Sequence, residues 1–102
     1  MEEVKIVGLT DGKLQVELSG DIDLGNAEAF FESVMSAYTA TPSDIEFDCT
    51  QLNFIDSTTL GTFVKILKTL KKDGRSMRLV GLQAKIKKLF LICSLDRIME
   101  IA

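Results

Sequence analysis

Histidine is absent from this sequence of 102 residues, and proline occurs only once. Without histidine, the chain has no Ser-His or Cys-His catalytic pair and no histidine-based metal site. It also has no glycine-rich phosphate loop of the GxxxxGK(S/T) or GxGxxG type. These absences argue against the common classes of hydrolase, metalloenzyme and nucleotide-binding protein. We therefore expect a protein that is not an enzyme and that requires no metal or other cofactor.

Cysteines and long hydrophobic runs are also scarce. The two cysteines, Cys49 and Cys93, lie far apart among apolar neighbours and form no CxxC pair, which predicts buried, reduced thiols. The longest apolar runs are far shorter than a membrane-spanning helix. The acidic start, Met1–Val4, lacks the hydrophobic region of a signal peptide. We expect a soluble cytoplasmic protein with no membrane partner.

Basic residues are fewer than acidic ones, so the net charge is −3 and the isoelectric point is about 4.9. A chain with this balance has no general attraction for phosphate backbones, so no direct nucleic-acid partner is expected. The acidic surface favours a monomer. Hydrophobic residues make up 46% and charged residues 26%, which is an ordinary globular composition. The length fits one domain over residues 1–102.

The hydrophobic pattern alternates between two periods and predicts an α/β fold. Segments of period two, or short apolar segments, predict strands at 4–9, 13–19, 44–50, 77–81 and, less regularly, 98–101. Spacings of three and four predict helices from Gly25 or Asn26 to about Thr39, from Asp56 to Gly74, and from Ala84 to Cys93. Between these elements we expect an interruption at Gly20–Asp23 and a loop at Leu52–Asp56.

The order of these elements is β-β-α-β-α-β-α, with a further strand at the end. The Asp11-Gly12 pair predicts a hairpin, so the first two strands should pair antiparallel. Strands joined through helices should be parallel neighbours. The sequence therefore predicts a mixed sheet of four to five strands with about three helices packed against it. In the second helix, Thr62 and Lys65 are expected on the solvent side.

The segment from Asn53 to Gly61 combines an acid with three hydroxyl side chains at the start of an amphipathic helix. The ordinary interpretation is that Asp56 or Ser57 caps free N–H groups of the helix. The same position also suits a phosphorylation switch. A phosphate on Ser57 would lie at the positive end of a helix dipole, and its charge would disrupt a partner surface centred there.

Four segments of the sequence together resemble the anti-sigma factor antagonists, which are small members of the STAS family. They are Val16–Asp23 (VELSGDID), Ile45–Asp48 (IEFD), Asn53–Gly61 (NFIDSTTLG), and Ile86–Phe90 (IKKLF) followed by Ser94-Leu95. The resemblance runs over nearly the whole chain and implies a single STAS domain over residues 1–102 with a STAS-like mixed sheet.

The resemblance also implies a function. In this family the serine after the loop aspartate, here Ser57, is phosphorylated by an anti-sigma factor that is a serine protein kinase. The unphosphorylated form binds the anti-sigma factor and frees a sigma factor, which regulates transcription. A metal-dependent serine phosphatase resets the phosphorylated form. The residues that this resemblance places near the phosphorylation site or the partner are Asp21, Asp23, Asp56, Thr58, Thr59 and Gly61.

Several alternatives remain at this stage. The family usually has Ser or Thr and then Gly after the switch serine, whereas this chain has Thr58 and Thr59, and Thr58 offers a competing phosphate acceptor. The chain could also be a scaffold subunit of a stress-signalling assembly, a paralogue without phosphorylation, or a nucleotide-binding STAS module. An enzyme would need a lysine such as Lys65 near Ser57. Asp21 and Asp23 alone specify a divalent ion weakly.

Overall fold

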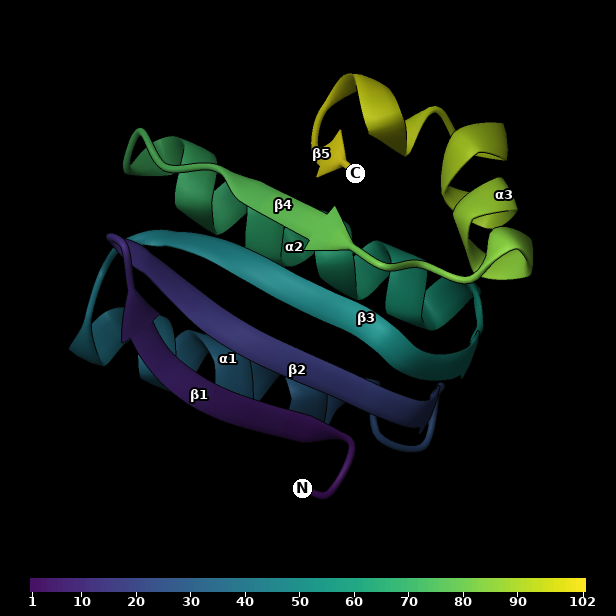
Figure 1. Ribbon diagram of the computed structural model, residues 1–102, viewed down its shortest axis with the longest axis horizontal. Coiled ribbons are helices and arrows are strands. Elements are labelled where there is room, and N and C mark those ends of the chain that lie inside the picture. Colours follow the sequence, from purple (N-terminus) through teal and green to yellow (C-terminus); the bar gives the residue numbers. More distant parts are fainter.

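The computed structural model describes residues 1–102 and contains one five-stranded sheet with three α-helices (Figure 1). Its elements are β1 (Val4–Thr10), β2 (Lys13–Ile22), α1 (Ala27–Ala40), β3 (Asp44–Ile55), α2 (Ser57–Lys72), β4 (Met77–Val80), α3 (Ala84–Ile92), the 3-10 helix η1 (Leu95–Arg97) and β5 (Glu100–Ile101). The strands lie in the order β1-β2-β3-β4-β5. β1 is antiparallel to β2, and all other pairs are parallel. The predicted mixed sheet and order of elements are confirmed.

One face of the sheet is covered by α1 and α2, and α3 packs beyond the end of β4 (Figure 1). The centre of the core is a cluster of four phenylalanines, each fully buried. The ring of Phe63 in α2 lies 5.2 Å from Phe30, 5.5 Å from Phe47 and 5.4 Å from Phe90, all in edge-to-face geometry. Because these rings come from β3 and all three helices, one core holds α2 in place. No helix has the combination of length and hydrophobicity that crossing a membrane requires.

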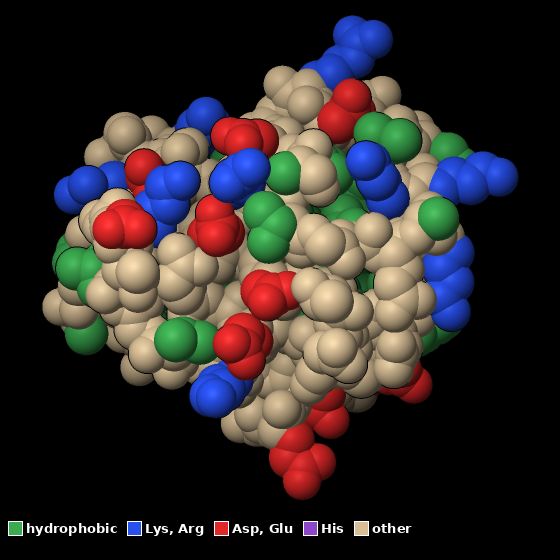
Figure 2. Space-filling view, in the orientation of Figure 1, with side chains coloured by type: hydrophobic (Ala, Val, Ile, Leu, Met, Phe, Trp, Pro, Cys, Tyr) green, Lys and Arg blue, Asp and Glu red, His purple; other side chains and the backbone are tan.

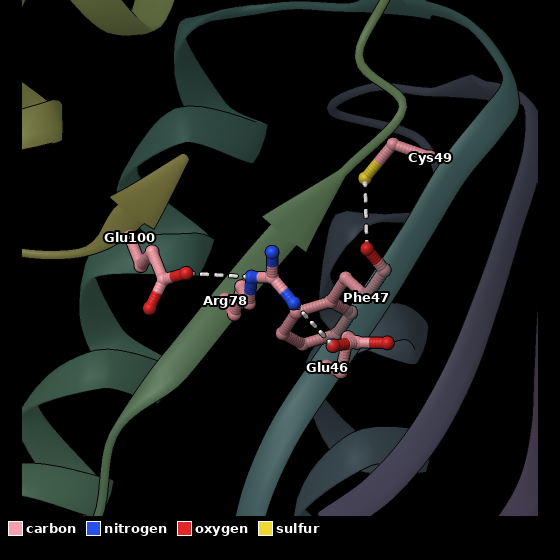
Figure 3. A network of polar contacts seen from close by, with 5 residues as sticks. All are labelled: Glu46, Phe47, Cys49, Arg78 and Glu100. Carbon is pink, nitrogen blue, oxygen red and sulfur yellow. Dashed lines mark hydrogen bonds and ion pairs between the residues drawn. The ribbon is translucent and has the colours of Figure 1, made fainter. Parts of the chain in front are cut away.

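The other face of the sheet has no helix over it and carries polar side chains (Figure 2). Arg78 on β4 joins its neighbours on both sides (Figure 3). Its Nη1 donates to Glu46 Oε2 of β3 at 3.2 Å, and its Nε lies 2.6 Å from Glu100 Oε2 of β5. The second contact is an ion pair without hydrogen-bond alignment, which leaves Nε without a hydrogen-bond partner. Since Arg78 and Glu100 are partly exposed, these contacts add little to stability.

The loop predicted for Leu52–Asp56 is wrong, because β3 continues to Ile55. Beyond Asp48 the pairing with β2 shifts twice, and β3 carries an extra residue at each shift. The buried positions are therefore Cys49, Leu52 and Ile55, at intervals of three instead of two. Each β-bulge inserts an unpaired residue and breaks the period-two pattern. The hydrophobic pattern of the sequence is therefore irregular over a segment in which β3 is continuous.

The interruption predicted at Gly20–Asp23 is also wrong in part. β2 runs through Gly20 and Asp21 to Ile22, and Ile22 pairs with Ile55 at the end of β3. Gly20 has a φ of 67°, which an L-residue with a side chain adopts only at a cost. This kink accounts for the loss of alternation. The consequence is that β2 and β3 end side by side, and both lead into the segments around Ser57.

Two side-chain placements also differ from expectation. Cys49 is buried, and burial raises the pKa of its thiol to about 12, but Cys93 is exposed at the end of α3. The chain leaves α3 through Ser94 in the left-handed region, with φ 58°, and this turn leaves Cys93 at the surface. Thr62 was expected to face solvent but is buried, with its hydroxyl donating to the carbonyl of Thr58 at 3.0 Å. That internal bond satisfies a polar group that hydropathy alone places outside.

Candidate functional site

Ser57 is the first residue of α2, and its side chain is exposed. Its hydroxyl makes no hydrogen bond within the chain, and the backbone N–H groups of Ser57 and Thr58 have no acceptor in the protein. Such unpaired N–H groups at a helix start carry the positive end of the helix dipole. The predicted location of Ser57 at an exposed helix start is confirmed.

Asp56 is the N-cap of α2 and also holds the neighbouring loop. Its Oδ1 accepts a hydrogen bond from the Thr59 amide at 3.0 Å, and its Oδ2 accepts one from the Leu24 amide at 2.9 Å. The Thr59 amide, with smaller contributions from the Leu24 amide and the Thr59 hydroxyl, lowers the pKa of the Asp56 carboxyl below its ordinary value. Asp56 therefore caps the helix, and the side chain of Ser57 takes no part in capping it.

Thr59 points into the protein and is completely buried. Its Oγ1 donates to the carbonyl of Ile22 at the end of β2, at 2.5 Å, and lies 3.1 Å from Asp56 Oδ1. The side chain thus fastens the first turn of α2 to the end of β2. Thr58, by contrast, is exposed beside Ser57. Of the two threonines that follow Ser57, only Thr58 is accessible from solution.

The two aspartates of the loop between β2 and α1 have different roles. Asp23 organises the loop, since its Oδ1 accepts from the Gly25 amide at 2.9 Å and its own amide donates to Asn26 Oδ1 at 2.8 Å. The exposed carboxylate of Asp21 makes no hydrogen bond or ion pair, whereas its backbone carbonyl accepts a hydrogen bond from Asn26 Nδ2. No group of three or more potential metal-ligating side chains forms. The loop is linked to the Ser57 end of α2 through Leu24 and Asp56.

Two large apolar side chains, one in the loop after β2 and one near the end of β3, are exposed, which the sequence analysis did not predict. Leu24, whose amide binds Asp56, is 76% exposed, and Phe54 is 48% exposed. Their signal in the sequence was weak, because single apolar residues within polar loop motifs are common on protein surfaces. Leu24 also borders a shallow groove that runs between α1 and α2. It is lined by Leu24, Ala27, Glu28, Phe31, Glu32, Thr58, Thr62 and Lys65.

Gly61 and Lys65 are two further exposed residues of α2 that follow Ser57. Gly61 is exposed, and a side chain at that position would meet no atom within 4 Å, so it leaves α2 flat there. The Nζ of Lys65 lies 4.3 Å from the centre of the Phe31 ring on α1. This contact is a cation–π interaction between the two helices and gives Lys65 a partner other than Ser57. The arrangement suits binding of another surface rather than activation of a nucleophile.

We expect the Thr59→Val variant to fold but to lose roughly 1 to 3 kcal/mol of stability. Valine has the shape of threonine but lacks the hydroxyl, so the buried carbonyl of Ile22 would lose its donor. Urea unfolding followed by circular dichroism would measure the change. Thr58→Val is the matched control, because the same substitution one residue earlier is exposed and should change stability by less than about 0.5 kcal/mol. Equal losses in the two variants would contradict the role given to the buried hydroxyl.

Comparisons with known proteins agree on one family. The model of the STAS domain matches residues 4–102. The anti-sigma-B factor antagonist of Bacillus subtilis (strain 168) is 30% identical over 92 residues, which is 90% of this chain and 84% of the relative. A Thermotoga maritima protein whose crystal structure is described as that of an anti-sigma factor antagonist is 28% identical. Its TM-score is 0.79, over 96% of this chain and 82% of that one.

The fold is also that of SpoIIAA, an anti-sigma factor antagonist. Its unphosphorylated form has a TM-score of 0.77 at 16% identity, over 97% of this chain and 86% of that one. The phosphorylated form, from Bacillus, has a TM-score of 0.74 at 20% identity, over 97% and 90% of the two chains. At these identities the likeness concerns the fold alone.

Proposed function

The chain belongs to the STAS domain family, among the anti-sigma factor antagonists, and on this premise we propose that it is a phosphorylation-controlled partner switch with Ser57 as the switch residue. In the unphosphorylated form it binds an anti-sigma factor that is a serine protein kinase, and so releases a sigma factor. Phosphorylation of Ser57 ends that binding, and a serine phosphatase restores it. The protein acts in the cytoplasm by binding rather than by catalysis.

The observation that carries this proposal is the free hydroxyl of Ser57 at the start of α2. A kinase needs an exposed hydroxyl, and Ser57 has one that no hydrogen bond occupies. Asp56 caps the helix, so modification of Ser57 does not remove a cap. Thr59 is excluded as an acceptor by its complete burial. Thr58 is exposed, but it does not directly follow the capping aspartate as Ser57 does.

A phosphate at Ser57 would change charge without requiring the fold to change. It adds about two negative charges, and the unpaired amides of Ser57 and Thr58 are available to it at the positive end of the helix. The carboxylate of Asp56 is held by the amides of Thr59 and Leu24. Because that carboxylate is fixed nearby, its repulsion would direct the phosphate outward, toward the bound partner.

The partner would contact the surface around Ser57. Leu24 supplies exposed apolar area, and the groove between α1 and α2, lined in part by Phe31, supplies shape and further apolar contact. Such apolar anchors beside charged groups are typical of protein interfaces. A dianion introduced next to these anchors would be desolvated by the partner without an opposite charge, which costs several kcal/mol. SpoIIAA, which shares the fold, exists in phosphorylated and unphosphorylated forms.

The proposal is tested by locating the phosphate. Wild type, Ser57→Ala and Thr58→Ala are incubated with ATP and the anti-sigma factor kinase of the same organism, and the products are mapped by mass spectrometry. We expect one phosphate at Ser57 in wild type and in Thr58→Ala, and none in Ser57→Ala. Full phosphorylation of Ser57→Ala would refute the assignment of the site. Equal affinity of the phosphorylated and free proteins for the kinase would refute the switch.

A further inference from the structure

A second surface, at the far end of α2, has features that the Ser57 switch does not use. There a groove of about 640 Å³ runs between the C-terminal half of α2 and η1. It is lined by Val64, Leu67, Lys68, Lys71, Lys72, Arg97 and Ile98. At a rise of 1.5 Å per residue, Lys68 to Lys72 lie about 17 to 22 Å from Ser57 along the helix. The groove is therefore separate from the switch site.

Four of the residues that line the groove are cations without partners. Lys68, Lys71, Lys72 and Arg97 are exposed. None of them forms an ion pair, and the two ion pairs of the chain both involve Arg78. The first function of Lys71 and Lys72 is local, since they offset the negative end of the α2 dipole. Lys68 and Arg97 are not needed for that purpose, and the set as a whole has an excess of positive charge.

The groove belongs to the basic half of a molecule whose charges are separated. Residues 1–57 contain 12 acidic and 2 basic residues, whereas residues 58–102 contain 3 acidic and 10 basic residues. Because the strands follow one another in the sheet, this division in sequence becomes a division in space. Figure 2 shows a row of Lys and Arg along the side of α3 and several Asp and Glu toward the side of β1, with side chains of both signs between them. Although the net charge of the whole chain is −3, the half formed by residues 58–102 is positive.

The floor of the groove indicates what kind of anion it would take. Val64, Leu67 and Ile98 form an apolar strip between the cations, and Ile98 is 46% exposed. A free phosphate could contact the lysines, but it would leave the apolar strip uncovered. A flat anionic membrane could contact the lysines, but it would not enter a groove between α2 and η1. An amphipathic protein segment satisfies both parts of the groove, with apolar side chains on the strip and carboxylates toward the lysines.

We propose that this basic groove is a docking site for an acidic amphipathic segment of a partner protein, independent of Ser57 and of its phosphorylation. The lysine side chains are flexible and exposed, so their attraction guides the segment and is weakened by salt. The apolar strip then supplies contact that salt does not screen. The two ends of α2 can therefore be occupied at the same time.

The test uses a short synthetic peptide whose leucines and glutamates lie on opposite faces of a helix. It is titrated into the nitrogen-15-labelled protein, and amide chemical shifts are followed by NMR. We expect shifts confined to the C-terminal half of α2, η1 and Ile98, and an affinity that falls as salt rises. The triple variant Lys68→Gln, Lys71→Gln, Lys72→Gln should bind at least about tenfold more weakly, which corresponds to ~1.4 kcal/mol. Ile98→Ser should also weaken binding.

The matched control is the triple variant Lys85→Gln, Lys87→Gln, Lys88→Gln in α3. It removes the same charge from the basic half and should alter affinity by less than about twofold. Equal losses in the two triple variants, or no binding by wild type, would overturn the proposal. So would equivalent shifts with inorganic phosphate, co-sedimentation with anionic lipid vesicles, or shifts of these residues that grow with protein concentration alone. The last result would identify a second copy as the occupant.

Discussion

We expect the Ser57→Asp variant to bind the anti-sigma factor about ten- to a thousand-fold more weakly than wild type, a loss of roughly 1.4 to 4 kcal/mol. Aspartate places a negative charge next to the surface that Leu24 and the groove between α1 and α2 form, where the proposed partner would bury it without compensation. Its charge is smaller than that of phosphate, so the loss should not exceed that caused by phosphorylation. Isothermal titration calorimetry with the purified anti-sigma factor would measure it.

Three further measurements separate this effect from others. Ser57→Ala should bind like wild type and remain bound when ATP is present. Ser36→Asp is the matched control, because it puts the same charge on an exposed serine of α1 and should bind normally. Circular dichroism should show native folding of all three variants, since Asp56 still caps α2. Undiminished binding by Ser57→Asp and by the phosphorylated protein would contradict the electrostatic switch.

We expect Phe63→Ala to lower the free energy of unfolding by about 3 to 5 kcal/mol. Phe63 is fully buried and contacts the rings of Phe30, Phe47 and Phe90. Alanine would leave a cavity where the sheet and the three helices meet. For a domain whose total stability is about 5 to 15 kcal/mol, this is a large fraction, and the melting temperature should fall by more than about 10 °C. Thermal unfolding followed by circular dichroism would measure it.

Phe54→Ala provides the comparison for that result. It deletes the same ring near the end of β3, where 48% of the side chain is exposed, and should change stability by less than about 1 kcal/mol. If Phe63→Ala were no less stable than Phe54→Ala, the aromatic cluster would not be the centre of the core.

Periodicity predicted the order and type of every main element because most of the strands and helices bury one face. It failed where the period itself changes. Two bulges in β3 move the buried positions to Cys49, Leu52 and Ile55, and the positive φ of Gly20 interrupts β2. Neither feature leaves a distinct local pattern, since a bulge is defined by pairing with the neighbouring strand. Thr62 was misplaced for a related reason, because its bond to Thr58 exists only once the helix has formed.

For the site, the sequence was sufficient to place Ser57 at a helix start and to suggest a cap at Asp56. It could not reveal that Asp56 also binds the Leu24 amide, 32 residues earlier in the chain. That bond depends on β2 and β3 ending side by side. The burial of Thr59 depends on the same register, through the carbonyl of Ile22. Local sequence placed Ser57, the proposed switch residue, at the helix start, and the tertiary structure determined which of its neighbours are accessible.

The order of the strands has a consequence for how the protein acquires its fold. Each strand pairs with the strand that follows it in the chain, from β1 to β5. No strand must be inserted between two strands that have already paired. Residues that pair in the sheet are therefore close in sequence for an α/β protein, and each new pairing closes only a short loop of chain. During synthesis, β1, β2, α1 and β3 can assemble while the ribosome still holds α3 and β5. Each later element then adds to an existing edge, which favours rapid folding with few unpaired strand edges exposed to aggregation.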